Sequence, residues 1–157
     1  MVETTDKSKR GRYFEDFEVG EEFVTLGKTI TEADVVLFAA FSGNHDPLHT
    51  DKEFCRQNSP YGEIVAHDTL GMVIQAMLSH DLGITEGTTM LAFLGMTWKF
   101  LKPIRIGDTL HVKQIVVDKK ETSKRGRGII TIQAQLINQL NEVIQEGTKS
   151  ILVACKR

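Results

Sequence analysis

LGMVIQAML, residues 70–78, is the most apolar stretch of the sequence, and Asp68 and Asp81 flank it. It falls well short of the ~20 residues that a membrane-spanning helix needs. With its neighbours it predicts a helix from about Ile64 to His80 that has little polar surface. Such a helix is stable only where other elements cover most of its sides, so the rest of the chain must wrap around it.

The second half of the chain is expected to supply that cover. Runs rich in β-branched and aromatic residues predict four strands, at Met90–Phe100, Thr109–Asp118, Gly128–Ile137 and Val143–Ala154. In the second and third runs apolar residues recur at every other position, which is typical of strands with one face on a core. The prediction is an α+β domain in which an antiparallel β-sheet wraps around one central apolar helix.

The first part of the chain predicts one strand and two further helices. EEFVTLGKTI, residues 21–30, is typical of a strand. Residues 31–34 (TEAD) match a capping box, and residues 42–43 (SG) supply the helix stop, because glycine readily adopts the left-handed conformation found at helix ends. Residues 50–53 (TDKE) repeat the capping-box pattern and predict a short helix that ends near Gln57.

At 157 residues the chain has the size of one domain, and we expect a flexible tail at residues 1–12 followed by a single domain at residues 13–157. The net charge of -2 argues against a polyanion partner such as nucleic acid. Cys55 and Cys155 lie far apart without other ligand-type residues, which indicates free thiols. The N-terminal residues lack an apolar core, so the predicted location is the cytoplasm, away from membranes.

A polar loop, SGNHDPLHTD at residues 42–51, separates the first two predicted helices. Pro47 fixes its own φ and keeps Asp46 out of the helical region, so an extended turn can present Asp46 and His49 toward one point. A histidine beside a carboxylate is the usual equipment for moving a proton to or from water. The alternative is a solvated loop in which Asn44 and Asp46 form Asx turns and the histidines have no role.

His67, Asp68 and Thr69 form a second candidate, at the start of the apolar helix. The first backbone N–H groups of a helix have no partner within it, so they can stabilise a developing oxyanion. The alternative is structural: Asp68 caps the helix and His67 packs in the core.

The order of these segments resembles the MaoC-like dehydratases, the (R)-specific enoyl-CoA hydratase branch of the hot-dog fold. FAAFSGNHDPLHTD at residues 38–51, followed by EIVAHDTLGM at residues 63–72, is similar to that family's hydratase motif, Ser-Gly-Asp-x-Asn-Pro-x-His, and to the helix start that follows it. The resemblance runs from about Arg12 to the end of the chain. It implies the hot-dog fold and a homodimer or a higher assembly of dimers.

Carried over to this sequence, the motif places the family's histidine on His49 and its proline on Pro47. The family's aspartate position holds Asn44 and its asparagine position holds Asp46, so the two side chains are exchanged. Asp68 stands where the family has its oxyanion-hole glycine. An amide cannot accept a proton as a carboxylate does, so Asn44 is expected to orient water while His49 acts as the base and Asp46 polarises the imidazole or takes the proton itself.

The resemblance therefore implies a hydro-lyase of the enoyl-CoA hydratase or 3-hydroxyacyl-CoA dehydratase type, which adds water to a trans-2-enoyl thioester. The expected catalytic residues are His49, Asp46 and Asn44, and the expected oxyanion and substrate-binding residues are His67, Asp68, Thr69, Ser42 and Gly43. The reaction implies an acyl-CoA partner, no metal or redox cofactor, and a role in fatty acid metabolism. Two alternatives stay open, namely an acyl-CoA thioesterase and a non-catalytic acyl-thioester-binding protein without the usual aspartate.

Two further patterns have mainly structural explanations. The turn KKETSKRGR, residues 119–127, is basic enough to meet a phosphate-bearing cofactor tail, but hairpin turns are commonly charged. Several large apolar side chains are candidates to line an acyl tunnel, although residues of this kind usually belong to the core. They are Met72, Met77, Met90, Met96 and Trp98.

Overall fold

The computed structural model describes residues 10–87 and 89–156, and its largest element is an antiparallel sheet of six strands. In spatial order the sheet contains β1 (Glu22–Val24), β6 (Thr109–Glu121), β7 (Arg127–Ile137), β8 (Val143–Ala154) and β4 (Met90–Phe100), and β2 (Lys28–Thr29) also pairs with β6. The four long strands predicted from the sequence are confirmed, and β6 continues three residues further than predicted, to Glu121. The single strand predicted at residues 21–30 is divided into β1 and β2.

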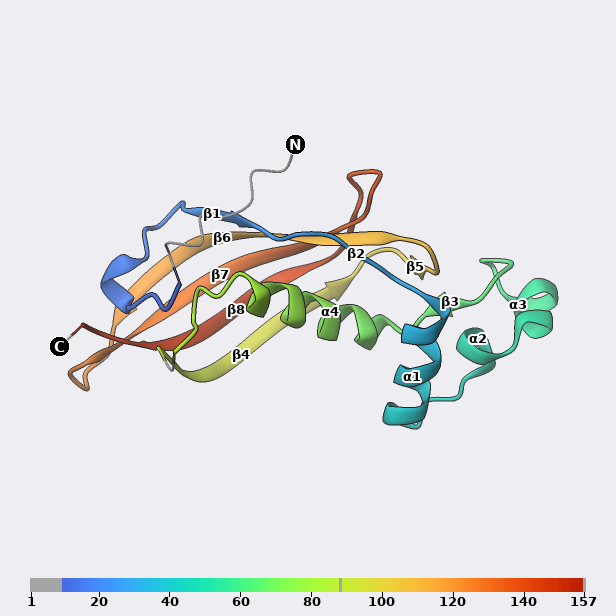
Figure 1. Ribbon diagram of the computed structural model, residues 1–157, viewed down its shortest axis with the longest axis horizontal. Helices are drawn as coiled ribbons and strands as arrows, with labels where there is room; N and C mark the ends of the chain where they lie inside the picture. Colours follow the sequence, from blue (N-terminus) through green and yellow to red (C-terminus); the bar gives the residue numbers. More distant parts are fainter. Residues whose placement is uncertain (1–9, 88, 157) are drawn as a thin grey trace.

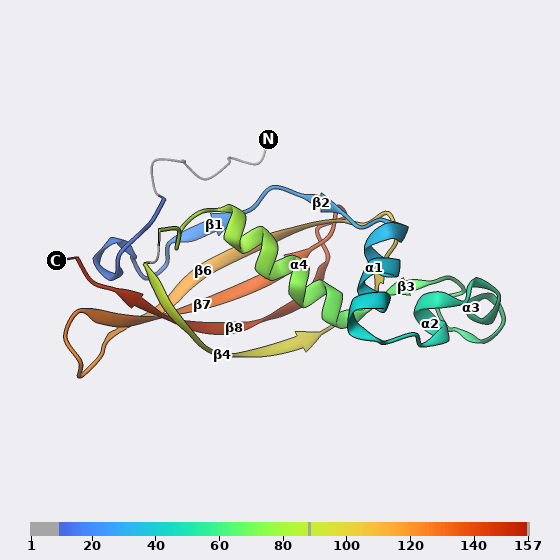
Figure 2. The same ribbon diagram turned by 60° about the horizontal axis from the view of Figure 1, so that its bottom comes forward.

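The sheet curls around α4 (Asp68–Asp81), which lies across one of its faces (Figures 1 and 2). Leu70, Ile74 and Leu78 of α4 are buried in one cluster with Leu110 of β6 and Leu136 of β7. This arrangement confirms the predicted hot-dog fold. It also gives the apolar helix its position, because burying this stripe against the sheet is the main favourable contribution to its stability.

Two details of the predicted central helix are wrong. It begins at Asp68 instead of Ile64, because Val65–Ala66 form strand β3 and pair with β5 (Ile104–Arg105). It is also not covered on most sides within this chain, since Val73, Ala76 and Met77, which share one face of the helix, are all exposed. An apolar face left open on the central helix indicates a surface that something else can contact.

The helix α1 (Glu32–Ser42) has the ends that the sequence predicts. The side chain of Thr31 accepts a hydrogen bond from the backbone N–H of Asp34, and the Asp34 carboxylate accepts one from the backbone N–H of Thr31. Gly43 ends the helix in the left-handed conformation, with φ at 73°. Both ends of the segment that precedes the polar loop are therefore fixed.

The polar loop itself is more helical than predicted. α2 (Pro47–Thr50) forms one helical turn that Asp46 caps, and α3 (Lys52–Asn58) follows it. The cap of α3 is Asp51, whose carboxylate accepts from the backbone N–H of Phe54, and not Thr50 as the capping-box pattern predicted. Thr50 is already the last residue of α2, because proline at the first helical position starts that turn early.

The predicted tail at residues 1–12 lies mostly outside the described residues, which begin at Arg10. The described part is packed against the domain: Gly11 donates its backbone N–H to the Gly83 carbonyl, and Arg12 forms an ion pair with Glu21. Cys55 and Cys155 are both free thiols, as predicted. Within residues 10–87 and 89–156, no helix combines the length and the apolar character needed to span a bilayer.

Candidate active site

Two histidines predicted as separate candidates lie in direct contact. The rings of His49, on α2, and His67, before α4, are stacked with their centroids 3.8 Å apart. His67 is almost fully buried and also contacts the ring of Phe38 on α1. The structure therefore joins the polar loop to the start of the central helix, at the end of the sheet where α1, α2 and α3 gather (Figure 2).

The hydrogen bond of His49 fixes which of its nitrogens can act as a base. Its Nδ1 lies 2.7 Å from the backbone carbonyl oxygen of Val65 in β3. A carbonyl oxygen can only accept, so Nδ1 carries the proton and Nε2 keeps a free lone pair in the neutral ring. Two roles are expected of Asp46, polarising the imidazole or taking the proton itself. The group bound to Nδ1 is the Val65 carbonyl, and the second role stays a prediction.

His67 plays a complementary part. Its Nε2 donates to the backbone carbonyl oxygen of Asn44 at 3.0 Å, which ties the polar loop to the start of α4. Burial lowers the pKa of His67 below its usual value, so the ring is neutral at pH 7 and Nδ1 is a hydrogen-bond acceptor. That Nδ1 is buried and has no hydrogen-bond partner among the described residues. A neutral ring with one engaged nitrogen is suited to positioning the loop and the neighbouring base.

The two exchanged side chains of the loop both bind loop backbone. Asn44 Oδ1 accepts from the backbone N–H of Asp46 at 3.1 Å, and Asp46 Oδ1 accepts from the backbone N–H of Leu48 at 2.8 Å. These are the Asx contacts that the sequence offered as an alternative to catalysis. They use one oxygen of each side chain, and no described residue donates to the second carboxylate oxygen of Asp46. The loop geometry is thus compatible with a structural and a chemical role for Asp46 at once.

Ser42 and Gly43 lie at the junction of α1 and the loop. Ser42 Oγ donates to the Phe38 carbonyl oxygen and accepts from the backbone N–H of Asn44. The left-handed Gly43 turns the chain toward α2. These contacts shape the loop. The thiol of Cys55, which is buried on α3, also donates to the Leu48 carbonyl oxygen at 3.3 Å, and the sequence pattern does not indicate this contact.

The start of α4 offers open backbone donors next to the stacked rings. His67 is the residue before the helix, and its side chain makes no capping hydrogen bond. No described residue accepts from the backbone N–H groups of Asp68 and Thr69, and both residues are exposed. Two unused donors at the positive end of a helix dipole are suited to binding an oxyanion. Water around the exposed Asp68 weakens the effect of its charge on such an oxyanion.

A hollow of about 310 Å³ opens beside His49. α1 contributes half of its lining residues, and the polar loop, α2 and the residues next to the small β3–β5 pair supply the rest. The apolar lining consists of Val35, Val36, Ala39, Ala40, Ile64 and Ile106. The candidate base therefore faces a space that can admit a small molecule.

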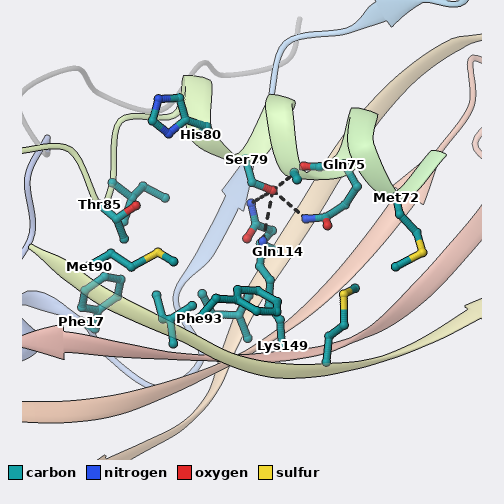
Figure 3. A pocket seen from close by; sticks show the side chains of 15 residues that line it. Phe17, Met72, Gln75, Ser79, His80, Thr85, Met90, Phe93, Gln114 and Lys149 are labelled. Carbon is teal, nitrogen blue, oxygen red and sulfur yellow. Dashed lines mark hydrogen bonds between the residues drawn. The ribbon is translucent and has the colours of Figure 1, made fainter. Parts of the chain in front are cut away.

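A second cavity, of about 270 Å³, lies between α4 and the sheet (Figure 3). Met72, Met90 and Met96 line it, so the prediction that most methionines are plain core is wrong for these three. Trp98 instead packs against the core cluster, as that prediction had it. Sequence reasoning missed a buried lysine in this cavity, Lys149, although its position two residues before Ile151 on β8 marks it as core-facing.

Other sequence-derived possibilities find less support in the geometry. The basic turn between β6 and β7 lies at the opposite end of the sheet from α2 and α3 (Figure 1). Lys119, at its edge, donates to the backbone carbonyl of Phe17, so it has a structural role. In the part of the chain that the structure describes, no group of three or more metal-ligand side chains gathers in one place.

Comparison with known proteins agrees with this arrangement. The profile of the MaoC like domain matches residues 16–136. The 3-hydroxybutyryl-CoA dehydratase of Methylorubrum extorquens is 31% identical over 144 residues, which cover 92% of this chain and 85% of that protein. The (R)-specific enoyl-CoA hydratase of Rhodospirillum rubrum is 28% identical over 148 residues, which cover 92% of this chain and 93% of the relative.

A solved structure gives the same result for the fold. The crystal structure of a monoamine oxidase regulatory protein from Archaeoglobus superposes with a TM-score of 0.86, at 28% identity, over 94% of this chain and 99% of that one.

Protein MaoC of Klebsiella aerogenes is 35% identical over 117 residues, which cover 74% of this chain, but they span only 33% of that protein's length. Since the profile covers most of the chain and the Methylorubrum dehydratase is 31% identical over nearly all of it, the chain belongs to the MaoC-like family and is a hydro-lyase of the hot-dog fold.

Proposed function

We propose that the chain is an enoyl-CoA hydratase, or a 3-hydroxyacyl-CoA dehydratase in the reverse direction, acting on a trans-2-enoyl thioester of coenzyme A. The observation that carries the proposal is the free lone pair of His49 Nε2, held in place through Nδ1 and stacked against the residue that precedes α4. The dehydratase and hydratase names of the relatives support the same class of reaction.

In the proposed reaction His49 Nε2 takes a proton from water while the water oxygen bonds to the β-carbon. The thioester carbonyl oxygen becomes an enolate oxygen, which the backbone N–H groups of Asp68 and Thr69 stabilise. The proton then passes from His49 to the α-carbon as the carbonyl reforms, so one water is added in total. The second carboxylate oxygen of Asp46 accepts a hydrogen bond from the other O–H of the water, which stays intact, and so orients the water. These steps use no metal or redox cofactor.

We also propose that the chain acts as a homodimer joined through β4. β4 ends the sheet, and an unpaired edge strand readily pairs with a second copy. Its large apolar side chains are unusually exposed in the single chain, namely Leu91, Phe93, Leu94 and Phe100. A cytoplasmic location and a role in fatty acid metabolism complete the proposal.

The direct test is the absorbance of the enoyl thioester during incubation of crotonyl-CoA with the protein, with a thiol reagent in a parallel sample. We expect the enoyl absorbance to fall without release of free coenzyme A. Release of the thiol would instead identify a thioesterase. Binding of crotonyl-CoA without either change would identify a non-catalytic thioester-binding protein.

The exchanged pair Asn44 and Asp46 gives a second prediction, tested by steady-state rates of the variants. Asp46→Asn keeps a good helix cap, so the fold should persist, whereas kcat should fall by about 10²-fold because the oriented water is lost. Adding Asn44→Asp to this variant should recover part of the lost kcat, since the double variant again has a carboxylate in the loop. Full activity of Asp46→Asn alone would refute the role of this carboxylate.

A further inference from the structure

The cavity between α4 and the sheet contains a polar cluster within apolar walls. The cluster consists of Gln75 and Ser79 on α4, Gln114 on β6 and Lys149 on β8, and we call it the donor cluster (Figure 3). Gln75, Gln114 and Lys149 are each less than a tenth exposed. Polar groups buried this deeply are costly unless they are hydrogen-bonded, so their partners decide what the cavity can bind.

Ser79 Oγ receives more donors than it has lone pairs. Gln75 Nε2 lies 2.7 Å from it, Gln114 Nε2 lies 3.0 Å from it and Lys149 Nζ lies 3.2 Å from it. The hydroxyl also donates to the backbone carbonyl of Gln75. A serine oxygen has two lone pairs, whereas the two amides and the ammonium group offer seven hydrogens by their chemistry. Even with the two amide oxygens counted, the donor cluster offers more hydrogens than the lone pairs of Ser79, Gln75 and Gln114 can accept.

The ammonium group of Lys149 has no negative partner in the described part of the chain. No described carboxylate forms an ion pair with it, and none lines the cavity. Among the other described residues that line the cavity, only His80 has an ionisable side chain. Burial lowers the pKa of Lys149 to about 8, so the group still carries its charge at pH 7. A buried cation with spare donors is best satisfied by an anion.

α4 connects this cluster to the candidate active site along one face. The α4 residues that line the cavity are spaced three and four apart, which places them on one stripe: Met72, Gln75, Ala76, Ser79 and His80. Continued by one turn toward the helix start, the stripe reaches Asp68 and Thr69. From Asp68 to Ser79 the helix rises by roughly 16 Å, at 1.5 Å per residue. An extended acyl chain of medium length spans this distance.

We propose that the cavity receives the far end of the acyl chain and that the donor cluster binds a carboxylate there. The inference rests on the proposed function and deepens it: the preferred substrates are enoyl thioesters that carry a second carboxyl group at the end of the chain. Lys149 supplies the charge, and Gln75 and Gln114 supply neutral donors. A carboxylate brings two oxygens and about four lone-pair sites, which is what the cluster lacks.

Binding of saturated thioesters tests the proposal apart from catalysis, because they cannot be hydrated. Titration calorimetry would compare sebacoyl-CoA, decanoyl-CoA and ω-hydroxydecanoyl-CoA, which have equal chain length. We expect sebacoyl-CoA to bind at least about tenfold more tightly than either of the others, as charge-assisted hydrogen bonds are the strong ones. Equal affinity for the hydroxyl compound would overturn the requirement for charge, and equal affinity for decanoyl-CoA would overturn the proposal.

The variant Lys149→Met should abolish this preference. The ratio of the affinity for sebacoyl-CoA to the affinity for decanoyl-CoA should fall to about one or below. The ratio does not depend on how much of the variant is folded. Lys120→Met is the matched control, since Lys120 is an exposed lysine on β6 outside the cavity, and it should keep the preference. A preference that survives Lys149→Met would overturn the role of Lys149.

The outcome is separable from that of the proposed function. If the protein hydrates crotonyl-CoA but does not prefer sebacoyl-CoA, only the carboxylate site is refuted. If it hydrates no enoyl thioester but binds sebacoyl-CoA in a manner that depends on Lys149, the site stands and the hydratase proposal is refuted.

Discussion

His49→Asn should lose about 10²- to 10⁴-fold in kcat for hydration of an enoyl thioester, the range expected when a general base is removed. Asparagine carries an N–H group near the position of the histidine Nδ1, so the hydrogen bond to the Val65 carbonyl oxygen can persist. What disappears is the lone pair of Nε2. The measurement is the steady-state rate of hydration of crotonyl-CoA, compared between the variant and the unaltered protein.

The control for this variant is His111→Asn, which changes a half-buried histidine on β6 outside the stacked pair. It should alter kcat by less than about twofold, because surface and half-buried changes away from the site rarely affect chemistry. A rate for His49→Asn close to that of the control would remove His49 as the base. Asp46 would then be the remaining candidate.

Gly71→Ala should destabilise the protein by about 3 kcal/mol, although alanine is the better helix former. In an exposed helix the exchange gains up to ~1 kcal/mol. Here a Cβ at position 71 would collide with the ends of the Gln145 and Ile104 side chains. Gln145 is fully buried, donates to the Asp68 carbonyl oxygen and accepts from Trp98 Nε1, both at 2.9 Å. Displacing it adds overpacking to lost buried hydrogen bonds, at about 1–3 kcal/mol each.

Urea denaturation followed by circular dichroism measures this change. Ala40→Gly, the reverse exchange at an exposed position of α1, should cost about 1 kcal/mol and so reports helix propensity alone. Stabilisation by Gly71→Ala would mean that α4 does not approach the sheet closely enough to require glycine.

The parts of the fold that depend on local pattern could be predicted from the sequence. The long strands follow from alternation, and α1 follows from its capping box and its terminal glycine. The start of α4 could not be predicted in the same way. Ile64 and Val65 continue an apolar pattern, but Val65 pairs with Arg105, forty residues later, and no local pattern records that pairing.

The candidate site likewise has parts that local sequence pattern predicts and parts that depend on contacts between distant residues. His49 and the start of α4 could be recognised from side chains, whereas the contact that orients His49 comes from the main chain of Val65. The donor cluster could have been noticed, because Gln114 falls among the buried positions of β6 and Lys149 among those of β8. Sequence patterns count such residues as interruptions of an apolar face, so their convergence on Ser79 becomes visible only in three dimensions.

The carbonyl of Val65 that holds His49 has an evolutionary consequence. Every amino acid has a backbone carbonyl, so no substitution at position 65 can delete the acceptor. The orientation of His49 therefore depends on the pairing of β3 with β5, and it does not depend on which side chains the loop carries. The loop can therefore carry its carboxylate at position 46 instead of 44 without changing how His49 is held, and a sequence motif that requires an aspartate at position 44 would miss such a chain.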